Sequence, residues 1–143
     1  MGAISGRAGG TPGERRGRPV KPTRGARAEQ TAAAFLRARG LRILASNYRV
    51  PQGEIDLIAE DAGTLAFVEV RLRSGDSHGG ALESIDRRKR RRILTAARHY
   101  LAQLREAEPP CRFDAVLLAP LRESGPERYT VEWLRDAFCA DDC

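Results

Sequence analysis

At 143 residues, with 41% hydrophobic and 31% charged residues, the chain can build one hydrophobic core but not two. It contains no run of about 18 apolar residues and no apolar segment of signal-peptide length at its start, which argues against a membrane span and against export. Its three cysteines, Cys111, Cys139 and Cys143, lack the CxxC spacing of zinc or redox sites. We therefore expect a cytoplasmic protein without a disulfide framework.

The formal net charge of +6 is concentrated at the start of the chain. Residues 1–27 contain seven Lys or Arg residues and one Glu, whereas residues 28–143 contain eighteen basic and eighteen acidic residues. Because residues 1–24 are rich in Gly, Arg and Pro and nearly lack large apolar side chains, we expect a disordered basic tail. This tail either contacts nucleic acid or is a solvated extension. Residues 25–143 are expected to form a single domain.

The first predicted element is an amphipathic helix over residues 26–39, which ends at Gly40. Three strand-like segments follow, over residues 41–50, 54–60 and 64–73. The segment Asp61-Ala62-Gly63, between the last two, is typical of a hairpin turn. The middle of the chain is therefore predicted to form antiparallel strands.

After a loop that contains Gly, Ser and His, a long helix is predicted over residues 84–104, with Ser84 as its N-cap and Pro109-Pro110 beyond its end. Three elements complete the chain, namely strands over residues 112–119 and 128–132 and a short helix from Trp133. The element order αβββαββα mixes helices and strands without strict alternation. We therefore expect an α/β fold in which helices flank a central mixed β-sheet.

Two carboxylates occupy strongly apolar strand segments. Glu69 shares a strand face with Phe67 and Arg71, because successive side chains of a strand point to opposite sides. If the hairpin pairs about its Asp61–Gly63 turn, Asp56 lies near the level of Glu69. A buried charge costs free energy unless it is paired or binds a metal. Since Mg²⁺ and Mn²⁺ prefer oxygen ligands, this pair is a candidate metal site.

Helix periodicity adds two further charges. Glu29 lies three, four and seven residues before Ala32, Ala33 and Leu36, and is therefore on or beside the buried stripe. Lys89 lies within the apolar stripe of its own helix, where it needs a partner, and a carboxylate cluster would supply one. The alternative is a purely structural set of ion pairs, in which Glu69 pairs with Arg71 and Asp56 pairs with Lys89.

Lys89 belongs to a run of six consecutive basic residues, 87–92. Neighbouring like charges repel each other, and an anionic ligand would relieve this repulsion. The candidate phosphate contacts are Arg87, Arg88, Arg91 and Arg92. The alternative is a solvated helix face.

Several segments together resemble the YraN family of uncharacterised bacterial proteins. They are Gly25–Glu29, Asn47-Tyr48-Arg49, Gly53-Glu54-Ile55-Asp56-Leu57-Ile58, Phe67-Val68-Glu69-Val70-Arg71, Lys89 and Arg112-Phe113-Asp114. The match covers about residues 25–131, and the ordered pair GEIDLI and FVEV makes it specific. That family is similar to the restriction-endonuclease-like superfamily and to archaeal Holliday-junction resolvases, so the resemblance implies a restriction-endonuclease-like fold.

The resemblance also implies an active site. Resolvases of this type use a helix Glu, a strand Asp and a Glu-x-Lys on the next strand, and the matching residues here are Glu29, Asp56, Glu69 and Arg71. Arg71 departs from the pattern, because arginine stabilises negative charge but stays protonated and hardly deprotonates water. Lys89 is the candidate to replace the missing lysine.

The resulting hypothesis is a metal-dependent endonuclease that acts on the phosphodiester backbone of DNA, with branched DNA among the candidate substrates. Asp56, Glu69 and the Val70 carbonyl would hold Mg²⁺ or Mn²⁺, Glu29 would complete the shell, and Arg71 and Lys89 would stabilise the transition state. The alternatives are a non-catalytic nucleic-acid-binding or scaffold protein with a nuclease-like fold, and a protein-interaction module. Resolvases act as symmetric dimers, so a homodimer is also a hypothesis.

Overall fold

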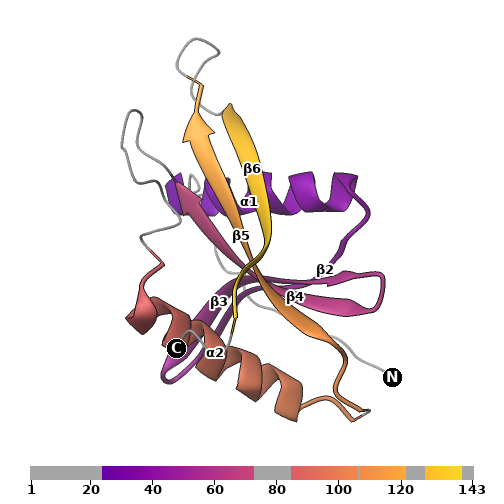
Figure 1. Cartoon of the computed structure of the whole chain (residues 1–143). Coiled ribbons are helices and arrows are strands. Elements are labelled where there is room, and N and C mark those ends of the chain that lie inside the picture. Colours follow the sequence, from indigo (N-terminus) through magenta and orange to yellow (C-terminus); the bar gives the residue numbers. More distant parts are fainter. Residues whose placement is uncertain (1–23, 73–84, 106, 122–127, 140–143) are drawn as a thin grey trace, which may run out of the picture.

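The structure, a computed structural model, describes residues 24–72, 85–105, 107–121 and 128–139. Its elements, in chain order, are α1 (Arg24–Ala38), β2 (Arg42–Val50), β3 (Gly53–Asp61), β4 (Thr64–Leu72), α2 (Arg87–Ala102), β5 (Cys111–Pro120) and β6 (Tyr129–Phe138) (Figure 1). The predicted α/β class and the first seven predicted elements are confirmed. The predicted basic tail before Arg24 and the loop after β4 lie outside the described residues. The predicted N-cap at Ser84 is wrong, because α2 begins at Arg87 and its N-cap is Asp86, whose side chain accepts a hydrogen bond from the Lys89 N–H.

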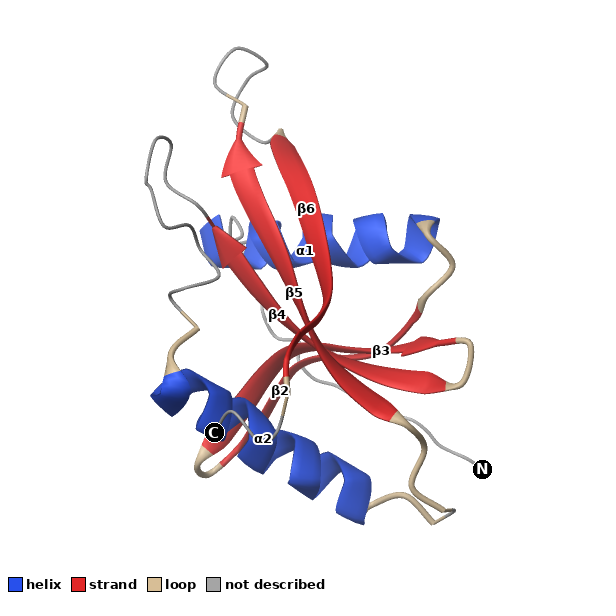
Figure 2. Ribbon diagram, viewed as in Figure 1, coloured by secondary structure: helices blue, strands red, loops and turns tan. Residues whose placement is uncertain are grey.

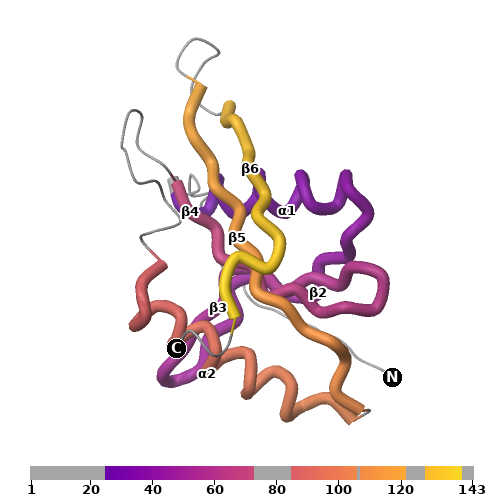
Figure 3. The backbone as a smooth tube through the Cα atoms, viewed as in Figure 1, coloured from indigo at the N-terminus to yellow at the C-terminus, as the bar shows by residue number. Residues whose placement is uncertain are grey.

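The five strands form one mixed sheet in the order β2-β3-β4-β5-β6. All neighbouring strands are antiparallel except β4 and β5, which are parallel. A parallel pair needs a crossover connection, and α2 lies in this connection. The helices α1 and α2 pack against opposite faces of the twisted sheet, each over its own hydrophobic cluster (Figures 2 and 3). Neither described helix is long and apolar enough to cross a membrane.

The turn between β3 and β4 sets the register of the hairpin. Asp61 pairs with Thr64, so the turn consists of Ala62 and Gly63, whose φ angles are 51° and 92°. Two consecutive positive φ angles are typical of the tight type I′ turn. The register continues to the pair Leu57 and Val68, which puts Asp56 and Glu69 at the same level, as predicted.

The predicted C-terminal helix is wrong, because the residues from Trp133 onward continue strand β6. Trp133 pairs with Val116, and Phe138 pairs with Phe113. The apolar residues of this segment fit a helical spacing, but the strand reaches the same contacts through an irregularity: the register shifts between Phe113 and Ala115, and Asp136 has a φ of 55°. Strand β6 supplies apolar side chains to both clusters, among them Trp133 to one and Phe138 to the other.

Gly53, the first residue of β3, makes the closest approach between the sheet and α2. A Cβ atom at this position would lie 2.3 Å from the carbonyl oxygen of Arg92 and 2.9 Å from the backbone nitrogen of Ala96. No real side chain tolerates such distances, so glycine allows β3 and α2 to meet here. The contact fixes the start of β3, and therefore Glu54, against the first turns of α2.

Candidate metal centre

A cavity of about 450 Å³ lies where α1, β3, β4 and α2 converge. Its lining residues are Gly25, Ala28, Glu29, Asp56, Glu69, Val70, Arg71, Leu72 and Lys89. The structure therefore brings together all six residues that the sequence assigned to a metal or catalytic site. They come from four separate elements, so the cluster depends on the tertiary fold.

Glu69, on β4, is the central carboxylate of this cavity. Its side chain is 2% exposed, and its Oε2 atom lies 3.5 Å from both the Nε atom of Arg71 and the Nζ atom of Lys89. Within the described ranges, the Oε1 atom of Glu69 has no hydrogen-bond partner. Burial, assisted by the negative charge of Asp56, raises the pKa of Glu69 to about 8. This carboxyl group is therefore short of stabilising partners.

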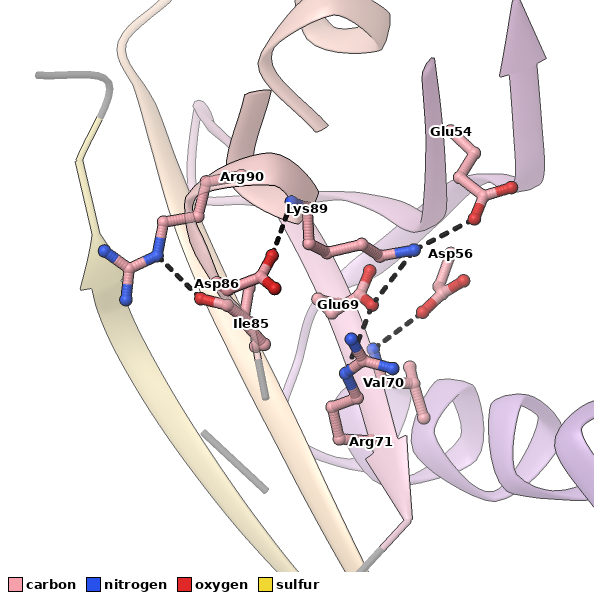
Figure 4. A network of polar contacts seen from close by, with 9 residues as sticks. All are labelled: Glu54, Asp56, Glu69, Val70, Arg71, Ile85, Asp86, Lys89 and Arg90. Carbon is pink, nitrogen blue, oxygen red and sulfur yellow. Dashed lines mark hydrogen bonds and ion pairs between the residues drawn. The ribbon is translucent and has the colours of Figure 1, made fainter. Parts of the chain in front are cut away.

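Asp56 is held beside Glu69 by the backbone of the neighbouring strand. Strands β3 and β4 pair as far as Leu57 and Val68, and beyond that point the Val70 N–H donates a hydrogen bond of 2.9 Å to Oδ2 of Asp56 (Figure 4). One neutral donor orients the carboxylate without cancelling its charge. Of the two ion pairs in the structural alternative, the pair of Glu69 with Arg71 is present, whereas Asp56 and Lys89 form none among the described residues.

Lys89 projects from the first turn of α2 into the cavity. Its Nζ atom donates a hydrogen bond of 2.9 Å to Oε2 of Glu54, and Glu69 lies slightly farther away (Figure 4). Burial lowers the pKa of Lys89, but the hydrogen bond to Glu54 and the charge of Glu69 outweigh it, so the pKa lies above its ordinary value. Lys89 is therefore a cation in this structure and is unsuited to act as a base. The same hydrogen bond lowers the pKa of Glu54.

Glu29, on α1, completes the acidic lining. The Nδ2 atom of Asn47 donates a hydrogen bond of 2.7 Å to its Oε1 atom. Burial and the nearby charge of Asp56 raise the pKa of Glu29, although the bond from Asn47 opposes this effect. The described residues contain no group of three His, Cys, Asp or Glu side chains arranged to hold a metal ion. Glu29 therefore does not join Asp56 and Glu69 in a described group of three direct ligands.

Sequence reasoning assigned no role to Glu54 or Asn47. Both stand within segments that carried the family resemblance, which was the only signal available. Asn47 has a φ of 52°, a left-handed backbone conformation that asparagine tolerates better than most residues. An asparagine within a strand segment was therefore a weak sign of an irregular backbone at this point.

The basic run of α2 divides into exposed and internally paired residues. Arg87, Arg88 and Arg91 are exposed. Arg92, also predicted as a phosphate contact, has its Nη2 atom 4.0 Å from Oε1 of Glu54. Arg90 donates a hydrogen bond of 2.9 Å to the carbonyl oxygen of Ile85. Three of the four arginines that were predicted to contact phosphate are therefore exposed to solvent.

A larger cavity, of about 590 Å³, lies between α2 and the strands β5 and β6. Phe67, Phe113 and Phe138 are among its lining residues, and Phe113 stacks on Phe138 with ring centroids 5.2 Å apart. None of its lining residues is a buried carboxylate that lacks a hydrogen-bond partner among the described residues. This cavity is the larger of the two. The buried carboxylate oxygen that lacks a described hydrogen-bond partner, Oε1 of Glu69, belongs to the smaller one.

The donor set of the smaller cavity fits a divalent cation. Asp56 and Glu69 lie at the same level of adjacent strands, and the Oε1 atom of Glu69 is a buried acceptor without a described partner. Carboxylate oxygens are the ligands that Mg²⁺ and Mn²⁺ prefer. A bound cation would supply the interaction that this oxygen lacks.

Comparison with known proteins places the chain in a family. The model of the uncharacterised protein family UPF0102 matches residues 28–118. The chain belongs to this family. UPF0102 proteins from Cupriavidus taiwanensis (53% identical over 125 residues, covering 86% of this chain and 88% of the relative) and Nitrosomonas europaea (50% over 115 residues, covering 80% and 92%) are similar to it along most of their length.

A UPF0102 protein from Paracidovorax citrulli is 55% identical over 120 residues, which cover 81% of this chain and 82% of the relative. The predicted membership of a YraN-like uncharacterised family is thus confirmed. The UPF0102 match runs from α1 into β5 and includes all six polar or backbone candidates of the metal centre. Strand β6 lies beyond the matched residues.

Proposed function

We propose that this UPF0102 protein is a metal-dependent nuclease that hydrolyses the phosphodiester backbone of DNA at the Asp56–Glu69 pair. The observation that carries the proposal is the buried Oε1 atom of Glu69, which has no hydrogen-bond partner in the described part of the chain. Leaving such an oxygen unsatisfied costs free energy, and groups of this kind gather at functional sites. A second carboxylate at the same level makes a cation the best-fitting partner.

Asp56, Glu69 and the Val70 carbonyl would hold Mg²⁺ or Mn²⁺, and Glu29 would bind through water. When bound, the cation would lower the pKa of a water molecule and neutralise charge on the scissile phosphate. The backbone bond from Val70 keeps Asp56 oriented. The restriction-endonuclease-like fold is part of this proposal, supported by the element order and by the acidic residues on α1, β3 and β4.

The two cations of the cavity would stabilise the negative charge that develops on the phosphate. Arg71 lies at the edge of the site, where 30% of its side chain is exposed. Lys89, whose pKa is raised, would remain an ammonium group that donates hydrogen bonds to phosphate oxygens. Neither residue would act as the base, so the proton of the attacking water would pass to a carboxylate of the cavity or to solvent.

The exposed arginines of α2 would hold the DNA backbone. Arg87 and Arg88 directly precede Lys89 on the first turn of the helix, and Arg91 follows on the next turn. A phosphate chain that passes over this turn would reach the cavity through Lys89. Such contacts are independent of base sequence, and the affinity would fall steeply with salt.

A non-catalytic DNA-binding protein is the second candidate. Lys89 and Arg71 already lie 3.5 Å from Glu69, so part of the carboxylate charge is offset within the chain. In that case DNA binding would need no metal, and Asp56→Asn would leave it unchanged.

Incubation of the full chain with branched, linear duplex and single-stranded DNA, with Mn²⁺ or Mg²⁺, tests the proposal. We expect cleavage of at least one substrate, abolished by chelation, by Asp56→Asn and by Lys89→Ala. Glu60→Gln is the matched control, since Glu60 lies on the same strand and pairs with Arg42 outside the cavity. Metal-dependent cleavage that survives in Asp56→Asn would contradict the proposed site, and salt-sensitive binding without any cleavage would favour the second candidate.

A further inference from the structure

The ammonium group of Lys89 lies between two carboxylates (Figure 4). Its Nζ atom is 2.9 Å from Oε2 of Glu54 and 3.5 Å from Oε2 of Glu69. Only the shorter of these contacts is a hydrogen bond. Lys89 is thus held by Glu54 while it remains close to the most buried carboxylate of the cavity.

This position creates a conflict with a divalent cation. A metal ion bound by Asp56 and by Oε1 of Glu69 would share the Glu69 carboxylate with the ammonium group, which lies 3.5 Å from its Oε2 atom. Two positive charges held by one partly buried carboxylate repel each other. The cation can therefore bind well only if another group keeps the ammonium from moving further toward Glu69.

The backbone around Glu54 and Lys89 is fixed on both sides. Gly53 packs against the backbone of α2 so closely that no side chain fits between them. On α2, the backbone N–H of Lys89 donates a hydrogen bond of 2.9 Å to the N-cap residue Asp86. The pairing of Glu54 with Lys89 is therefore built into the docking of strand on helix and is no chance contact of two flexible surface chains.

We propose that Glu54 is a positioning residue, which holds the ammonium group of Lys89 beside the Asp56–Glu69 pair and thereby raises the affinity of that pair for a divalent cation. The inference rests on the proposed function, because it assumes a cation site at these two carboxylates. Without Glu54, the remaining carboxylate in an ion pair with Lys89 is Glu69. The ammonium would then compete with the metal for the same carboxylate.

Calorimetric titration of Mn²⁺ into the full chain tests this role without any assay of activity. The proteins compared are the wild type, Glu54→Gln, Lys89→Met and the double variant. We expect Glu54→Gln to weaken Mn²⁺ binding about tenfold, and Lys89→Met to bind more tightly than the wild type. In the Lys89→Met background, Glu54→Gln should change the affinity less than about twofold, because it acts through the ammonium.

Glu60→Gln is the matched control for this experiment. Glu60 and Glu54 lie on the same strand, their side chains are 31% and 32% exposed, and each forms an ion pair. The control should leave Mn²⁺ binding unchanged. A thermal melt of each variant shows that it is folded at the temperature of titration, and Lys89→Met alone still tests the competition if Glu54→Gln does not fold.

Two results would overturn the inference while leaving the metal site intact. One is wild-type affinity in Glu54→Gln, and the other is an equal loss in both backgrounds, which would mean that Glu54 attracts the metal directly. If neither the wild type nor Lys89→Met binds Mn²⁺, the metal site itself is wrong, and the proposed function fails together with the inference.

Discussion

The described part of the structure buries two acidic side chains, Asp114 and Glu69, and gives them opposite surroundings. Asp114, on β5, accepts hydrogen bonds from the side chains of Arg112 and Trp133 and from the backbone nitrogen of Asp136. Glu69, on the adjacent strand β4, faces two cations at 3.5 Å and has one oxygen without a described partner. Both carboxylates are buried, but both oxygens of Asp114 accept hydrogen bonds, whereas one oxygen of Glu69 has no described partner.

The two residues are also neighbours in the sheet. Val68 pairs with Asp114 and Glu69 pairs with Ala115, so the two carboxylates stand one residue apart in register and point to opposite faces. Asp114 receives a hydrogen bond from the Trp133 side chain of β6, whereas the Glu69 side chain lines the cavity on the other face. The number of partners, more than the depth of burial, therefore distinguishes Asp114 from Glu69.

Replacement of Asp114 should have the largest effect on stability. Asp114→Ala would leave the Trp133 indole and the Asp136 N–H without their acceptor, while Arg112 keeps its ion pair with Asp61. Each buried donor left unsatisfied costs about 1–3 kcal/mol. Urea unfolding should show this loss, whereas Mn²⁺ affinity of the folded protein should not change. A loss below about 1 kcal/mol would mean that the network of Asp114 is dispensable.

The cavity that contains Glu69 depends on the close backbone contact between Gly53 of β3 and helix α2. Gly53→Ala would force β3 away from α2, and overpacking of this kind costs about 1–3 kcal/mol in unfolding free energy. It should also weaken Mn²⁺ binding, because Glu54 would move away from Lys89. Gly25→Ala is the control, since a Cβ atom there would meet no other atom within 4 Å. Equal stability of the two variants would contradict the close approach.

The raised pKa of Glu69 should make the stability of the protein depend on pH. The pKa of Glu69 is raised from 4.5 to about 8 in the folded protein, so between these values the folded state binds more protons than the unfolded state. The free energy of unfolding should therefore fall as pH rises through this window, by at most about 1.4 kcal/mol per pH unit from this group. Glu69→Gln should abolish that contribution. Identical pH profiles of wild type and variant would contradict the raised pKa.

Much of the cavity could be predicted from the sequence because its features are local. The hairpin turn and strand alternation predicted that Asp56 lies near Glu69, and helix periodicity predicted that Glu29 and Lys89 face inward. All four residues line the cavity. The partners of these residues could not be predicted. The contact of Glu54 with Lys89 depends on how closely a strand docks on a distant helix.

The error at the C-terminus has a similar cause. The segment after Trp133 carries apolar residues at helical spacing, and only the pairing with β5 and the irregular backbone at Asp136 make it a strand. The same pairing explains why no role was predicted for Asp114, whose donors Trp133 and Asp136 come from β6. Contacts between elements far apart in sequence thus decided both features.

Titration of Mn²⁺ into the wild type and into the variant Asp56→Asn/Glu69→Gln, followed by calorimetry, tests the central claim most directly. Both substitutions keep the shape of the side chains, and the amide oxygen introduced by Asp56→Asn can still accept the hydrogen bond from the Val70 N–H. We expect saturable binding in the wild type that is lost in the double variant while its fold is kept. Absence of binding in the wild type, or equal binding in both proteins, would contradict a metal centre at these carboxylates.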